Sequence, residues 1–195
     1  MTPHDYALLA QQAYSSAPTI GKEDGAARAV VFPDGVVGFP GTDNLECWLA
    51  DLNALAIDVP GMGRLHEGFW GAFKEISAPL LALDGVTVTL GHSEGAALAL
   101  LYAAQLCLAG KPPREVYAFE PPRVSADGVL AALFKAHGVQ LHLYRNGNDI
   151  VPLVPRLLED WRHPGELASI GTASEPFPNT TDHEMVRVIA ALPAG

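Results

Sequence analysis

Cysteine is scarce in this 195-residue sequence, which contains only Cys47 and Cys107. Two cysteines cannot build a disulfide framework, and their separation matches no metal-binding spacing. We therefore expect two free thiols, with a single bridge as the alternative. The sequence offers no metal-ligand spacing elsewhere, so we expect neither a metal site nor a cofactor.

Basic residues are also scarce, with 12 Lys and Arg against 22 Asp and Glu and a formal net charge of −10. Such a balance argues against nucleic acid and anionic membrane surfaces as partners, because both carry negative charge themselves. It favours neutral substrates. The 49% hydrophobic content and 17% charged residues are typical of a globular chain, and the length suits one domain.

Long apolar runs are missing as well. The longest uncharged apolar segment has 16 residues between Glu94 and Lys111, which is shorter than a membrane span and predicts a buried helix. The first residues lack the basic region and apolar stretch of a signal peptide. We therefore expect no integral membrane segment and a cytoplasmic protein, with non-classical export or lysis as alternatives.

Hydrophobic periodicity predicts alternating helices and strands. Strands are expected at residues 27–32, 36–39, 86–90, 115–119 and 140–144, with a short hairpin over 161–170. Helices are expected at residues 5–14, 44–56, 66–83 (interrupted near Pro79), 93–108, 127–137 and 181–192. Alternation after residue 86 implies parallel strands joined by crossovers, and the Pro33-Asp34-Gly35 turn predicts an antiparallel hairpin. The prediction is one α/β domain over residues 1–195, with a mostly parallel central sheet and helices on both faces.

The segment Gly91-His92-Ser93-Glu94-Gly95 joins the predicted strand 86–90 to the long helical pattern after it. A serine at the apex of a strand–turn–helix, with glycine two positions to either side, is typical of a nucleophile elbow. The glycines let the strand and the helix approach closely while the turn exposes the hydroxyl. Ser93 is therefore the candidate nucleophile.

Serine needs a base, and the base needs a carboxylate that orients it; in α/β hydrolases the chain order is Ser, acid, His. Asp149 fits the acid, since it lies in a turn-rich segment that follows the strand 140–144. Asp127 and Asp160 are the rivals, but both lie at predicted helix ends, where a capping or solvated role is expected.

His183 fits the base, because it comes last in the chain at the start of the final helix. His163, in a turn, and His142, within a strand, are the alternatives. His92 neighbours the nucleophile but points the wrong way to serve as its base. The oxyanion would be held by the backbone N–H of Glu94 and by Thr42, which follows an early strand.

Several blocks together resemble the class 3 lipases, a family of α/β hydrolases that includes the fungal triacylglycerol lipases. The blocks run in family order over roughly residues 5–190: Phe39-Pro40-Gly41-Thr42, Cys47 to Leu52, Leu65 to Phe69, Gly91 to Gly95, Phe119 to Val124, Asn148 to Pro152, Trp161 to Leu167 and Asp182-His183. The resemblance implies that residues 43–56 form a lid helix in which Trp48 and Leu49 cover the serine, with a fixed helix as the alternative. It also implies a structural role for His163.

Four positions depart from the family pattern: Pro40, Glu94, Ala96 and the Glu120-Pro121 pair, which stands where the family prefers glycine followed by a small residue. None removes a catalytic group. The Glu94 side chain is expected to interact favourably with the helix dipole. The alternative is that it stabilises protonated His183.

The expected function is a serine carboxylic-ester hydrolase of lipase type that cleaves acylglycerols or similar lipid esters through an acyl-serine intermediate. Its partners would be a small-molecule lipid or ester substrate and, transiently, a lipid interface. Rivals on the same fold are a short-chain esterase, a phospholipase A1 and an acyltransferase. From another class, a catalytically silent binding scaffold is the alternative.

Overall fold

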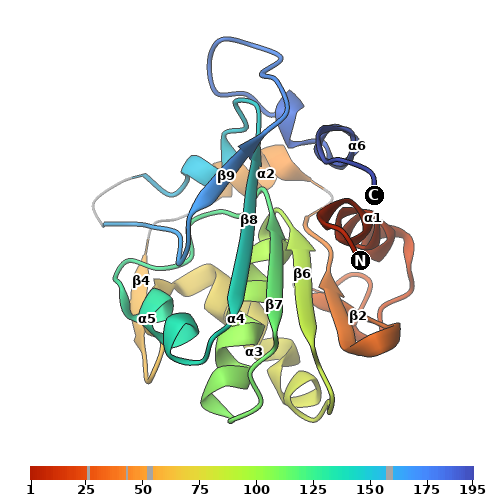
Figure 1. The fold of residues 1–195 in the computed structure, drawn as a ribbon. Coiled ribbons are helices and arrows are strands. Elements are labelled where there is room, and N and C mark those ends of the chain that lie inside the picture. Colours follow the sequence, from red (N-terminus) through yellow and green to blue (C-terminus); the bar gives the residue numbers. More distant parts are fainter. Residues whose placement is uncertain (26, 43, 52–54, 157–159) are drawn as a thin grey trace.

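The computed structural model describes residues 1–25, 27–42, 44–51, 55–156 and 160–195 (Figure 1). Its strands are β1 (Ile20–Gly21), β2 (Arg28–Phe32), β3 (Val36–Phe39), β4 (Ala56–Val59), β5 (Gly63–His66), β6 (Val88–His92), β7 (Glu115–Phe119), β8 (Gln140–Asn146) and β9 (Leu167–Ile170). The α-helices are α1 (Pro3–Ser15), α2 (Leu45–Asp51), α3 (Glu67–Leu81), α4 (Glu94–Leu108), α5 (Val129–Ala136) and α6 (Met185–Ala191). Three short 3₁₀ helices are η1 (Pro33–Gly35), η2 (Val151–Leu153) and η3 (Thr181–His183).

Seven strands form the central sheet in the order β1-β2-β3-β6-β7-β8-β9. The pairs β1–β2 and β2–β3 are antiparallel, whereas β3–β6, β6–β7, β7–β8 and β8–β9 are parallel. The predicted fold class is therefore confirmed: a mostly parallel sheet with an N-terminal antiparallel hairpin. Because β6, β7 and β8 are adjacent and parallel, the loops that follow them meet at one edge of the sheet.

Helices cover both faces of the sheet (Figure 1). Each face of the sheet has its own hydrophobic cluster. Helices α3, α4 and α5 contribute to one cluster, and α1 and α6 contribute to the other. Strand residues alternate between the clusters, as Val116 and Tyr117 do on β7, because successive side chains point to opposite sides. The chain's first and last helices, α1 and α6, lie side by side, with both termini near them.

The long uncharged run forms α4, as predicted, and nearly every residue of this helix is buried. It packs against the sheet, α3 and α5, and of its residues only the last, Leu108, is exposed. Tyr102 at its centre is fully buried and donates its hydroxyl proton to the carbonyl of Leu80 at 2.7 Å. No helix in the part of the chain that the structure describes is long and apolar enough to cross a membrane.

The helix predicted over residues 44–56 is wrong at its C-terminal end. Helix α2 ends at Asp51, residues 52–54 lie outside the described part, and Ala56 begins β4. β4 and β5 form a separate antiparallel hairpin that the sequence did not predict. Gly61 and Gly63 take φ of 78° and 79° in this turn, a backbone that glycine adopts without strain.

Three other predicted boundaries differ from the structure. Helix α3 continues through Pro79, because the carbonyl that the proline leaves without a donor lies on the solvent-exposed side of the helix. The hairpin predicted over 161–170 is absent; β9 instead pairs in parallel with β8. The final helical segment is divided at Glu184, so that His183 lies in η3 and not in α6.

Candidate active site

Ser93 occupies a strained turn between β6 and α4. Its φ of 58° and ψ of −130° lie outside the regions that non-glycine residues prefer. A Cβ at Gly91 would collide with the backbone of Gly95, and a Cβ at Gly95 would collide with the carbonyl of Phe39. The glycines therefore permit the close approach that this turn requires, as the sequence predicts.

Asp149 and His183 come together at the same edge of the sheet. The Nδ1 atom of His183 lies 2.6 Å from Oδ2 of Asp149, and both side chains are buried. Oδ1 of Asp149 accepts a second hydrogen bond, from the N–H of Val151 at 3.0 Å. Because Nδ1–H donates to the carboxylate, Nε2 of His183 is the nitrogen left to accept a proton.

The rival residues lie elsewhere. The Asp127 carboxylate accepts from the N–H of Val129 at the start of α5, which is a capping role, and Asp160 is exposed. His142 lies 3.2 Å from Glu115, at the opposite end of β7 from the Ser93 edge. His163 donates from Nε2 to the carbonyl of Pro152 at 2.9 Å.

The hydroxyl of Ser93 makes no hydrogen bond to any described residue, and the side chain is only 1% exposed. The His183 ring lies beside the ring of His92, the residue before Ser93, with 4.4 Å between centroids. The candidate base thus packs against the residue next to the candidate nucleophile, and no hydrogen bond joins it to the Ser93 hydroxyl. In free enzymes such bonds are often long and tighten when substrate binds.

His92 positions His183 through the backbone. Its Nδ1 accepts from the hydroxyl of Tyr14 at 2.7 Å, and its Nε2–H donates to the carbonyl of His183 at 2.9 Å. Burial, together with the neighbouring His183, holds the pKa of His92 well below its ordinary value. Both ring nitrogens are engaged, so the neutral ring has no nitrogen free to act as a base.

The two candidate oxyanion donors flank the turn at Ser93. Glu94 is the first residue of α4, so its N–H has no acceptor within the helix. A Cβ at Gly41 would come within 2.8 Å of the His92 carbonyl and 2.9 Å of the Ser93 Cβ, so only glycine lets this segment approach. Thr42 follows, and its Oγ1 accepts from the N–H of Asn44 at 3.3 Å.

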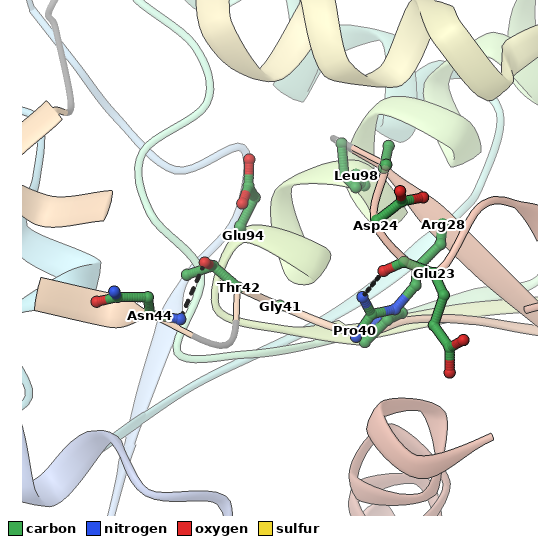
Figure 2. Close-up of a pocket in the computed structure, with 11 residues that line it drawn as sticks. Glu23, Asp24, Arg28, Pro40, Gly41, Thr42, Asn44, Glu94 and Leu98 are labelled. Carbon is green, nitrogen blue, oxygen red and sulfur yellow. Dashed lines mark hydrogen bonds between the residues drawn. The ribbon is translucent and has the colours of Figure 1, made fainter. Parts of the chain in front are cut away.

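Thr42 lines two cavities beside the candidate site. A cavity of about 490 Å³ is lined by Tyr14, His183 and apolar side chains that include Leu45 and Met185. The other, of about 420 Å³, is more polar (Figure 2). In this second cavity Thr42 and Glu94 lie on one side, and the charged residues Glu23, Asp24 and Arg28 lie on the other.

Glu94 is partly buried in the wall of the polar cavity. Burial raises the pKa of its carboxyl to about 7, although a hydrogen bond from Trp48 opposes the shift. No interaction among the described residues joins its side chain to His183. Trp48, from the expected lid segment, also stacks on Phe69 with 6.0 Å between ring centroids, and Leu49 is half-buried.

Glu120 is a buried neighbour of Asp149 that the sequence prediction did not place in the site. It follows β7 with a φ of 53°, and its side chain is fully buried. One ligand atom each from Glu120, Asp149 and His183 lie within 4.8 Å of one another, a spacing that alone would suit a cation. The bond between His183 and Asp149 already uses two of these groups, however. The departure from glycine at this position was the signal available in the sequence.

Two curated proteins resemble this chain, and both are described as "Secreted mono- and diacylglycerol lipase A". One is from Penicillium cyclopium and the other from Penicillium camembertii; each is 30% identical over 163 residues, covering 77% of this chain and 52% of the relative. The chain thus spans about half the length of the curated relatives it matches. Their secreted status contradicts the expectation of a cytoplasmic protein, which rested only on the first residues of the sequence.

Solved structures show the same fold. The Rhizomucor miehei lipase–propeptide complex aligns with a TM-score of 0.70 at 23% identity, covering 86% of this chain and 67% of that one. A lipase from Rhizopus microsporus var. chinensis aligns with a TM-score of 0.59 at 21% identity, covering 86% and 66%. The family model described as "Lipase (class 3)" matches residues 36–159. With a match over most of its length, the chain belongs to the class 3 lipase family.

Proposed function

We propose that this protein is a serine carboxylic-ester hydrolase of lipase type, which cleaves acylglycerols or similar lipid esters. The proposal rests on the strained turn at Ser93, which lies at the same sheet edge as the hydrogen-bonded Asp149–His183 pair. The names of the curated relatives support the substrate class. A metal-free and cofactor-free mechanism uses only these side chains.

In the proposed mechanism Ser93 attacks the ester carbonyl while Nε2 of His183 takes the hydroxyl proton. The carbon–oxygen bond to the alcohol then breaks, and His183 returns the proton to the departing alkoxide. Asp149 holds the imidazole in the Nδ1–H tautomer and stabilises the imidazolium. Water, deprotonated by the same base, hydrolyses the acyl-serine and regenerates the enzyme.

The oxyanion of each tetrahedral intermediate would accept hydrogen bonds from the N–H groups of Thr42 and Glu94. The Thr42 hydroxyl supports this role, because its oxygen already accepts from Asn44 and its proton is free to donate. The Glu94 side chain is not needed for this contact. Burial raises the pKa of its carboxyl to about 7, which opposes the favourable dipole interaction expected from the sequence, and no described contact supports a bond to protonated His183.

The test is hydrolysis of p-nitrophenyl esters from acetate to palmitate by wild type and Ser93→Ala, with a fluorophosphonate probe to label the serine. We expect Ser93→Ala to lose at least about 10³-fold in kcat and all labelling. Activity strongest on long chains supports a lipase, and activity confined to short chains indicates an esterase. Absence of both turnover and labelling in wild type would favour the silent scaffold.

We further propose that the protein acts outside the cell and contacts lipid surfaces transiently, with α2 as a lid. Trp48 supports the lid, because its contacts with Phe69 and Glu94 hold α2 close to the start of α4. Opening would break these contacts and present the apolar side chains of α2 to lipid.

Interfacial opening predicts that the hydrolysis rate jumps when the ester concentration passes its solubility limit. Trp48→Ala weakens the closed state, so we expect higher activity on dissolved ester and a jump reduced about threefold. Trp70→Ala is the matched control, since it removes an indole from α3 that packs near Phe73 and not on α2. A smooth rate curve in wild type would contradict the lid.

A further inference from the structure

We propose that Glu120 is a neutral carboxylic acid that donates a hydrogen bond from Oε2 to the carboxylate of Asp149. It is thus a positioning residue for the Asp149–His183 pair, and this role depends on the function proposed above. Three successive parallel strands would then each deliver one group to the site: Ser93 after β6, Glu120 after β7 and Asp149 after β8.

The backbone holds Glu120 in an unusual conformation. Its φ of 53° lies in the left-handed region, which residues other than glycine seldom adopt. The N–H of Glu120 donates to the carbonyl of Tyr144 on β8 at 2.9 Å, which ties the turn to the strand that leads to Asp149. A strained backbone conformation of this kind persists only where the surrounding contacts hold it in place, and such residues are frequent at functional sites.

The orientation of the carboxyl group leaves one oxygen for the proton. Oε1 accepts from the backbone N–H of Asn146 at 2.6 Å. Oε2 is buried and has no donor among the described residues. An ionised Glu120 would leave this oxygen charged and unsatisfied, whereas protonation turns it into a donor. The Asp149 carboxylate is the acceptor at hand, since one of its oxygens lies within 4.8 Å of a Glu120 carboxyl oxygen.

Two adjacent buried carboxylates share one proton, because both cannot ionise together. Asp149 is the better anion of the two, since it accepts from Val151 N–H and from His183, whereas Glu120 accepts only from Asn146. The proton therefore resides on Glu120. Burial first, and then the hydrogen bond and charge of Asp149, raise the pKa of Glu120 well above its ordinary value.

The charged and titratable groups around Glu120 are consistent with this state. Asp149 and His183 face it from the loop after β8 and from η3. Arg145 on β8 favours ionisation, but its Nε donates at 3.0 Å to the backbone carbonyl of Asp149 and not to Glu120. The asparagine that contacts Oε1 is neutral.

A neutral donor stabilises the Asp149 anion without adding a second negative charge beside His183. Part of the Asp149 charge is taken up by this bond, which weakens its attraction for a second proton on the imidazole. The imidazolium form of His183 is therefore stabilised less by Asp149 than it would be beside a carboxylate without this hydrogen bond. Removing the donor reverses this effect, so the acidic limb of kcat/KM moves to higher pH.

The test compares Glu120→Gln with Glu120→Met. Glutamine can accept from Asn146 through its carbonyl and donate to Asp149 through its amide, whereas methionine keeps the volume and does neither. We expect Glu120→Gln to retain kcat within about threefold, and Glu120→Met to lose about tenfold or more with its acidic limb raised by about one pH unit. Glu115→Met on the same strand is the matched control, since it alters a glutamate far from Asp149.

Two further measurements separate this inference from the proposed function. Infrared spectra at neutral pH would compare Ser93→Ala with Ser93→Ala/Glu120→Gln, both of which are inactive. The difference should show the carbonyl band of a protonated carboxyl group that is lost with Glu120. Glu94 is present in both proteins, so its contribution cancels. An NMR titration should show a higher His183 pKa in Glu120→Met. Both readouts work without turnover, so a failure of hydrolysis alone would count only against the proposed function. Absence of the band, or equal acidic limbs in Gln and Met variants, would overturn the inference.

Discussion

At the scale of single residues, the candidate site is held together by groups that do not themselves react. A chain of hydrogen bonds runs from the Tyr14 hydroxyl through His92 to the backbone of His183. It joins α1, at the start of the sequence, to η3, near its end. Burial disfavours the charged form of the His92 ring, and the neighbouring His183 lowers the pKa of His92 further, so the ring in this chain is neutral.

Tyr14→Phe should lower kcat about three- to tenfold, because Nδ1 of His92 loses its donor and the ring loses its fixed orientation against His183. The KM should change less, since phenylalanine keeps the aromatic ring that Tyr14 contributes to the cavity wall and only the hydroxyl is lost. Tyr6→Phe is the matched control: it removes a hydroxyl from the same helix, where the ring stacks on Tyr117 with 4.1 Å between centroids.

Steady-state kinetics on a soluble ester would check this prediction. Equal kcat values for Tyr14→Phe and wild type would show that the His92 orientation is set by packing alone. Equal losses in the Tyr14 and Tyr6 variants would instead indicate a general effect on α1.

At the scale of secondary-structure elements, the sequence predicts what is local and periodic. The strand before Ser93 and the apolar run that forms α4 are each decided by side chains within the element. The helix predicted over 93–108 forms over Glu94–Leu108, and the strand predicted over 86–90 forms two residues later, over Val88–His92. The order of Ser93, Asp149 and His183 along the chain, together with the predicted strand positions, is also enough to choose these three residues as candidates for one site at the edge of the sheet.

Elements that depend on distant partners are less predictable. β9 has four residues and is defined by its pairing with β8, so its local pattern was mistaken for a hairpin. Ala56 was assigned to a helix because its neighbours continue a helical period, but pairing with His66 makes it the start of a strand. Glu120 shows the same limit within the site: its partner Asp149 lies 29 positions away, and only the fold reveals the contact.

At the scale of the whole molecule, two carboxyl groups outside the reacting centre make stability depend on pH in opposite directions. Burial opposes the ionisation of Asp182, but hydrogen bonds from Asn148, Ser174 and Asn179 outweigh it and lower the pKa to about 2. Asp182 thereby ties the loops before and after β9 to η3, which carries His183. Burial shifts the pKa of Glu94 the other way, to about 7.

The sign of each contribution follows from proton linkage. A carboxyl whose folded pKa is lowered, like Asp182, stabilises the fold above its ordinary pKa of 3.8, and this contribution disappears as the pH falls towards 2. A carboxyl whose folded pKa is raised, like Glu94, destabilises the fold progressively as the pH rises from its ordinary pKa of 4.5 to about 7. Taken together, these two carboxyl groups should contribute most to the free energy of unfolding between roughly pH 4 and 5. The lowered pKa of buried His92 acts in the opposite sense to Glu94, because its contribution to stability rises as the pH rises towards its ordinary value of 6.5.

Urea unfolding at a series of pH values, with wild type, Glu94→Gln and Asp182→Asn, would measure both contributions. Glu94→Gln should remove most of the decline between about pH 4.5 and 7, worth up to roughly 3 kcal/mol at about 1.4 kcal/mol per pKa unit. Asp182→Asn should lower stability by up to about 2 kcal/mol at neutral pH and flatten the acidic side. The net charge of −10 also disfavours the folded state as pH rises, but it acts almost equally on wild type and variants and so largely cancels in the comparison. If wild type and Glu94→Gln showed the same pH dependence between about pH 4.5 and 7, Glu94 would already be ionised at the start of α4, where the helix dipole stabilises its charge.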